Sequence, residues 1–366
     1  MKSKLLRLLW KVSLITLKGV IPAKAGIQEN TGFTRTKYPV SSTGQAKAGL
    51  VKPGMTNYTR LMSSCIIILL LGMFWAGAVP AHAAQIRIVT TLTDLADFAR
   101  NIGGDLVEVH SLATGVEDTH GVPMKPSFVH MMNRADLLFL VGLECEHAFL
   151  PALIEASKNP RILRDRAGYI DCSKGIIPLG VPKSTERYAG DVHPYGNPHY
   201  MLDPVLAKTA IKNIYNALVE FAPQHQAEFT QNRDAYLAKL DAKIAEWEKE
   251  AKPLKGVKFV SYHEHWPYFA ARFGMVFFGT IELRPGIDPT PRHIEELVAA
   301  MKAEHVPIVV REPQFPERVP KRIAEQTGAT MIMLPIMPGG VLNTETYMKM
   351  MDYIIQTMVK AIQNRK

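Results

Sequence analysis

Short apolar runs and amphipathic stretches alternate along the chain from residue 85 onward. The apolar runs at 85–91, 107–112 and 135–142 predict strands, and the last of them is apolar enough for a buried parallel strand. Residues 93–102 and a segment that starts near 127 have the three- and four-residue apolar spacing of helices. This order predicts an α/β domain with a parallel sheet, in which ligands gather at the carboxyl ends of the strands.

A long amphipathic stretch at 226–252 separates this pattern from a second, similar one. It contains no Gly or Pro, and its apolar stripe consists of Phe229, Tyr236, Leu237, Leu240, Ile244 and Trp247. Further strands are predicted at 257–262, 276–279 and 307–312, and further helices at 266–273, at 291–304 and from 344 onward. We therefore predict an α/β fold of two lobes, each with a parallel sheet flanked by helices, joined by one long backbone helix.

The net charge of +9 belongs to the beginning of the chain. Residues 1–60 hold eleven basic side chains and one acidic one, which leaves 32 basic and 33 acidic residues downstream. Because the folded part is nearly neutral, the main reason to expect a nucleic-acid partner is lost.

Residues 55–83 have the parts of a secretory signal peptide. Arg60 precedes an apolar run at 65–79, and Ala81-His82-Ala83 follows as a small-residue cleavage site. The run is about 15 residues long, shorter than the roughly 20 needed to span a bilayer. Cleavage near Ala83/Ala84 is therefore favoured over a retained membrane anchor, and we expect a periplasmic or secreted protein.

These features divide the chain into segments with different roles. We expect residues 1–54 not to be part of the native product, 55–83 to be the signal peptide, 84–224 the N-terminal lobe, 225–252 the linking helix and 253–366 the C-terminal lobe. Only Cys145 and Cys172 remain after cleavage, and their spacing fits neither a redox motif nor a thiolate zinc site. A disulfide between them stays open.

Four histidines lie in loops beside predicted strands: His120, His193, His199 and His263. Imidazole is a common zinc ligand, and loops at strand ends allow ring nitrogens from distant parts of the chain to converge. A single loop histidine is more often solvated or capping, and neither H-E-x-x-H nor paired C-x-x-C is present. Since neighbouring strand positions face opposite ways, we expect at most one of His263 and His265 to point into a site.

Three stretches resemble a known family, the TroA-like (cluster A-I) solute-binding proteins of zinc and manganese ABC importers. They are 118–143, 196–204 and 260–269, and the resemblance extends over nearly all of 85–363. It implies that His120 and His199 from the N-terminal lobe and His263 from the C-terminal lobe bind the metal.

The fourth ligand position departs from the family pattern. The segment 333–340, where the family commonly has an aspartate, contains no acid. Glu312 ends a predicted strand and is our candidate for this position, with Asp118 and a bound water as competitors. The acidic, histidine-rich capture loop of some zinc members is also missing, so a second, weak capture site is not expected.

The resemblance implies high-affinity capture of a divalent metal, with Zn²⁺ as the first choice and Mn²⁺ as the alternative. It further implies a monomer that delivers the ion to an inner-membrane permease with its ATPase. A secreted zinc hydrolase is the alternative from another class, but no general base at a fixed offset from a ligand and no G-x-S-x-G motif is found. The sequence does not distinguish a metal carrier of an importer from an adhesin-like interaction protein with the same fold.

Overall fold

The computed structural model describes residues 85–182, 193–283 and 286–364, all of which belong to one unit of the chain, residues 80–366. The expectations for residues 1–83, including the signal peptide and its cleavage site, lie outside the described residues. Within the described part, no helix is both long and apolar enough to cross a membrane.

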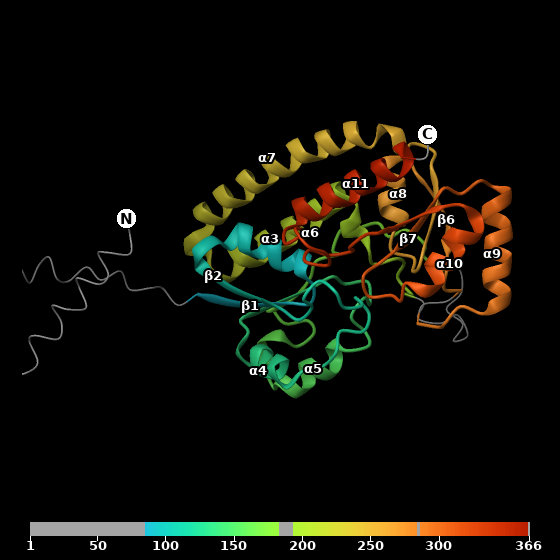
Figure 1. Cartoon of the computed structure of the whole chain (residues 1–366). Coiled ribbons are helices and arrows are strands. Elements are labelled where there is room, and N and C mark those ends of the chain that lie inside the picture. Colours follow the sequence, from blue (N-terminus) through green and yellow to red (C-terminus); the bar gives the residue numbers. More distant parts are fainter. Residues whose placement is uncertain (1–84, 183–192, 284–285, 365–366) are drawn as a thin grey trace, which may run out of the picture. The chain divides into compact units, whose positions relative to one another are not determined.

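The N-terminal lobe contains a parallel sheet of four strands in the order β2-β1-β3-β4. The strands are β1 (Ile86–Thr90), β2 (Val107–Ser111), β3 (Leu137–Leu140) and β4 (Tyr169–Asp171). Every residue of β3 is apolar and buried, as expected for a strand covered on both faces. Helices α3 (Thr93–Gly103) and α6 (Pro204–Phe221) cover one face, and α4 (Pro126–Arg134) and α5 (Leu150–Ser157) cover the other (Figure 1).

The C-terminal lobe repeats this topology, because its strands follow the order β6-β5-β7-β8. The strands are β5 (Lys258–Ser261), β6 (Val276–Thr280), β7 (Ile308–Arg311) and β8 (Thr330–Met333). The helices are α8 (Pro267–Phe273), α9 (Pro291–Ala303), α10 (Arg318–Thr327) and α11 (Tyr347–Gln363). The connections leave β5 and β7 in opposite directions, and ligands of open α/β sheets bind at the carboxyl ends of two such strands.

The long helix α7 (Gln226–Glu250) packs against α3, α6 and α11 (Figure 1). Its predicted apolar stripe is buried at Phe229, Tyr236, Leu240, Ile244 and Trp247. The Trp247 indole Nε1–H donates a hydrogen bond of 2.7 Å to Asp352 on α11. The helix is therefore held along its length by tertiary contacts.

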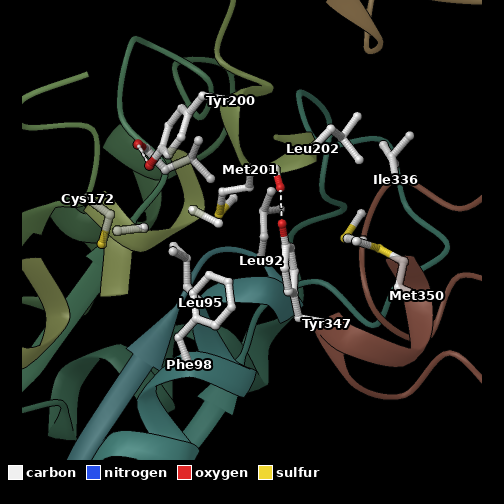
Figure 2. Close-up of a cluster of buried hydrophobic side chains, with 14 of the residues drawn as sticks. Leu92, Leu95, Phe98, Cys172, Tyr200, Met201, Leu202, Ile336, Tyr347 and Met350 are labelled. Carbon is white, nitrogen blue, oxygen red and sulfur yellow. Dashed lines mark hydrogen bonds between the residues drawn. The ribbon is translucent and has the colours of Figure 1, made fainter. Parts of the chain in front are cut away.

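The two lobes share one continuous apolar cluster (Figure 2). Tyr347, the first residue of α11, is completely buried and donates a hydrogen bond of 2.6 Å from its hydroxyl to the Met201 carbonyl in the N-terminal lobe. The backbone N–H of Tyr347 donates to Asp97 on α3 at 3.0 Å, and its ring lies 5.0 Å from that of Phe98. A large movement of one lobe against the other would break this packing, which costs several kcal/mol per buried large side chain.

The predicted fold class of two α/β lobes and a long helix is confirmed. Five elements were not assigned from the sequence: α5, β4, α6, α10 and β8. The three residues of β4 are too few to show a pattern, and α6 lies directly behind the loop of His199, where turn-forming residues conceal its start. Cys145 and Cys172 are both buried, and no disulfide joins them.

Candidate metal centre

Four histidines meet at the junction of the lobes: His120, His199, His263 and His265. One ring nitrogen of each lies within 4.8 Å of those of the other three. Their exposed fractions are 6%, 8%, 4% and 0% in that order. The Nε2 atoms of His120 and His199 are 3.3 Å apart, and two ring nitrogens at this distance need a shared proton or a shared cation between them.

The two histidines of the N-terminal lobe are positioned by bonds from their own loops. The backbone N–H of His120 donates to Asp118 at 2.9 Å, and that of His199 donates to Asn197 at 2.9 Å. His120 Nδ1 lies 3.3 Å from the Cys145 carbonyl, an arrangement that turns Nε2 toward the cluster.

The loop behind His120 is itself braced by a buried carboxylate. Glu146 accepts hydrogen bonds from the Thr91 hydroxyl at 2.6 Å and from the Val141 N–H at 2.6 Å. Burial raises the pKa of Glu146 to about 7, against the lowering effect of these bonds. Glu146 thereby ties together the chain segments that follow β1 and β3.

The two histidines of the C-terminal lobe follow the carboxyl end of β5. Past Ser261 the chain leaves the strand and turns, and the N–H of His265 donates to the carbonyl of His263 at 2.9 Å. This turn brings both rings into the cluster, with their centroids 4.3 Å apart. The expectation that at most one of the pair points into the site is wrong, because the alternation of a strand does not apply beyond its last residue.

Each of these two histidines has a buried carboxylate behind it. His263 Nδ1 bonds to Glu282, which follows β6, and His265 Nδ1 lies 3.2 Å from Glu312, which follows β7. Glu312 also accepts a hydrogen bond of 2.8 Å from the Trp266 indole N–H. Carboxylates in this position fix the tautomer and orientation of metal-binding imidazoles and raise their basicity.

Burial and these neighbours shift the protonation of the cluster. Burial, reinforced by the neighbouring histidines, lowers the pKa of His199 and His265 well below the usual value. Burial also acts to lower the pKa of His263, but the bond to Glu282 and its charge outweigh it and raise that pKa. Burial raises the pKa of Glu312 to about 8. His199 and His265 are thus neutral at pH 7, with a lone pair available to a cation.

The positions expected from the sequence separate into two groups. His120, His199 and His263 are brought together, and His265 joins them. Glu312 is not one of the four grouped residues, and it lies behind His265. Its direct binding to a metal therefore stays a prediction, and His265 is the alternative fourth ligand. Asp118 bonds to the backbone of His120.

Glu282 and His293 were not among the predicted metal ligands. Glu282 bonds to His263, and its place after a strand of the parallel sheet was the signal for a site residue. His293 lies outside the cluster, with Nε2 3.0 Å from the Thr280 carbonyl.

Comparisons with known proteins agree on one family. The family model described as "Zinc-uptake complex component A periplasmic" matches residues 88–361. The high-affinity zinc uptake system protein ZnuA of Yersinia pestis is 24% identical over 308 residues, which cover 78% of this chain and 93% of that protein. The manganese ABC transporter substrate-binding lipoprotein PsaA of Streptococcus anginosus is 24% identical over 291 residues, 76% of this chain and 89% of that one. A crystal structure of ZnuA superimposes with a TM-score of 0.64 at 27% identity, covering 76% of this chain and 99% of that one.

Proposed function

The chain belongs to the family of periplasmic zinc-uptake components, and from this premise we propose that it captures Zn²⁺ and delivers it to an ABC importer. The observation that carries the proposal is the group of four buried histidines drawn from both lobes. An ion held there bonds to the N-terminal lobe through His120 and His199 and to the C-terminal lobe through His263 and His265.

The chemistry of the four side chains supports zinc over manganese. Imidazole nitrogen suits Zn²⁺, whereas Mn²⁺ prefers carboxylate, carbonyl and water oxygens. Four nitrogens complete the tetrahedral coordination that is usual for bound zinc. Glu282 and Glu312 lie behind the rings. A bound cation favours the ionised form of a carboxyl group near it, so that both side chains then offset the charge of the ion without touching it.

The same arrangement supports binding without catalysis. A catalytic zinc keeps one open position for the water that it activates. When His120, His199, His263 and His265 all bind, no position is left for water. We therefore place the protein among carriers, and we expect no hydrolysis of ester or peptide substrates with zinc bound.

Delivery completes the proposed cycle. The cargo passes to an inner-membrane permease that is driven by its ATPase, and the carrier acts as a monomer. Residues 55–83 direct export and are cleaved near Ala83/Ala84. The apolar core shared by the lobes favours release through a small tilt of the lobes.

Metal analysis of untagged protein tests the proposal. Protein purified without added metal is expected to contain one zinc per chain, and competition through a calibrated chelator is expected to favour Zn²⁺ over Mn²⁺. If the purified protein carries manganese and keeps it against equimolar zinc, the manganese alternative holds. If neither ion binds tightly, the capture function is wrong.

A further inference from the structure

The four-histidine cluster is buried, so an ion needs a way into it. Beside it, in the N-terminal lobe, lies a cavity of about 730 Å³ at the carboxyl ends of β3 and β4. Its lining includes Leu143, Glu144, His147, Tyr169 and Tyr195. The exposed imidazole of His147 can bind a metal ion through a ring nitrogen. His147 follows Cys145 by two residues, and the Cys145 carbonyl contacts His120.

His193 lies between this cavity and the cluster. Its ring centroid is 6.1 Å from that of His147 on one side and 4.5 Å from that of His120 on the other. Both ring nitrogens are shielded from solvent. Burial, reinforced by the neighbouring histidines, lowers the pKa of His193 to about 3, against the raising effect of the Glu144 backbone. Neither ring nitrogen meets the geometry of a hydrogen bond with a described residue. A shielded imidazole of this kind carries an unmet bonding capacity that a metal ion satisfies.

The turn after β3 orients His147. Gly142, Leu143 and Glu144 all have positive φ, at 87°, 53° and 60°. This conformation is sterically strained for Leu143 and Glu144, because they are not glycine. The turn brings the Glu144 carbonyl to within 2.9 Å of His147 Nδ1. Because Nδ1–H donates to this carbonyl, the lone pair of His147 is on Nε2, which is the state of a metal ligand.

We propose that His147 and His193 form an entry site, which holds Zn²⁺ transiently on its way from the cavity to the four-histidine cluster. Exposure falls along this route, from the exposed His147 through the partly buried His193 to His120 at 6%. The two rings come from loops 46 residues apart in the chain, and a second capture site was not expected from the sequence. The inference rests on the proposed zinc capture, and the tests below separate the two.

Binding kinetics in the full chain provide the first test. His147→Ala and His193→Ala are each expected to slow zinc association by about tenfold, equivalent to ~1.4 kcal/mol of barrier. Dissociation slows to the same extent, because an entry site lowers the barrier in both directions, and the Kd is unchanged. His130→Ala, at an exposed histidine on α4, is the matched control and leaves both rates as they are. Wild-type rates in both variants overturn the entry site.

Equilibrium binding in a disabled protein is the second test. In the double variant His199→Ala/His263→Ala the main site is lost, and the entry site is expected to bind zinc alone in the micromolar range. Adding His193→Ala is expected to abolish this residual binding. No residual binding, or residual binding that survives His193→Ala, contradicts the proposal.

The two proposals fail in different ways. Wild-type protein that binds zinc tightly, together with unchanged rates in the variants and no residual site, refutes the entry site and leaves the capture function intact. Wild-type protein without tight zinc binding refutes both.

Discussion

The Nδ1 atom of His265 lies 3.2 Å from a carboxylate oxygen of Glu312, and both side chains are completely buried. The other oxygen of Glu312 and the Nε2 of His265 have no hydrogen-bond partner among the described residues. The contact turns Nε2 of His265 toward the other three rings of the cluster. We infer that Glu312 acts on the metal through His265.

The first prediction concerns His265 itself. His265→Ala removes one of four metal–nitrogen bonds and is expected to cost about 3 kcal/mol of zinc affinity, a quarter of the roughly 10–16 kcal/mol of a structural zinc site. Competition titration against a calibrated chelator measures it. His293→Ala, which changes a histidine outside the cluster, is the control and is expected to be neutral. Equal effects of the two substitutions would remove His265 from the ligand set.

The second prediction separates Glu312 as a positioning residue from Glu312 as a direct ligand. Glu312→Gln keeps an oxygen for the Trp266 N–H but cannot take up the negative charge that a bound cation favours, so zinc affinity is expected to fall by about tenfold. Glu282→Gln is expected to have a similar effect through His263, because the two carboxylates occupy equivalent places.

X-ray absorption of the zinc-loaded protein provides the readout that a direct bond would change. Four nitrogen neighbours in both wild type and Glu312→Gln fit the positioning role. One oxygen neighbour that disappears in the variant would show that Glu312 binds the metal directly.

The sequence predicted those parts of the site that follow local patterns. His120, His199 and His263 stand in loops beside predicted strands, and strand ends of a parallel sheet converge. His265 was missed because strand alternation was applied past Ser261, where β5 ends and the chain turns.

The pairing of each histidine with its support depends on tertiary packing. The chain separation between His265 and Glu312 is 47 residues, and that between His263 and Glu282 is 19. Neither separation has a local signature. The apolar core that the lobes share could not be predicted from the sequence either, because residues in contact there, such as Tyr347 and Asp97, are 250 residues apart in the chain.

The third prediction is a pH dependence of stability that comes from Asp94. This residue is 1% exposed, and burial, helped by the charge of Asp97, raises its pKa well above the usual value. The folded state therefore binds the proton more tightly than the unfolded state, whose pKa is about 3.9. The resulting contribution to stability is complete below that value and is lost as the pH rises through the folded pKa.

Asp94→Asn abolishes this titration. The free energy of unfolding of the variant is expected to rise relative to that of the wild type as the pH increases above about 4, because only the wild type loses stability through this group. Urea unfolding of metal-free protein at a series of pH values measures the difference. Asp105→Asn, at an exposed aspartate, is the control. A difference that does not change with pH would show that Asp94 has no raised pKa.

The last prediction concerns the contact between the lobes at Gly115. This residue has a φ of 114°, and a Cβ there would lie 2.5 Å from the Gly339 backbone and 2.8 Å from that of Gly340. Nearby, the Thr93 hydroxyl donates to the Pro338 carbonyl at 2.8 Å. The segment 338–340 of the C-terminal lobe is therefore packed backbone to backbone against the loop that leads to His120.

Gly115→Ala is expected to lower the free energy of unfolding by about 2 kcal/mol or more, through backbone strain and overpacking. It is also expected to weaken zinc binding, because the lobes that supply two histidines each are forced apart. Gly121→Ala is a stringent control: Gly121 is next to His120 in the chain, yet a Cβ there meets nothing within 4 Å. Chemical unfolding and zinc titration of both variants test the argument. If Gly121→Ala weakens zinc binding as much as Gly115→Ala does, proximity to the ligand and not the fit between the lobes determines the loss.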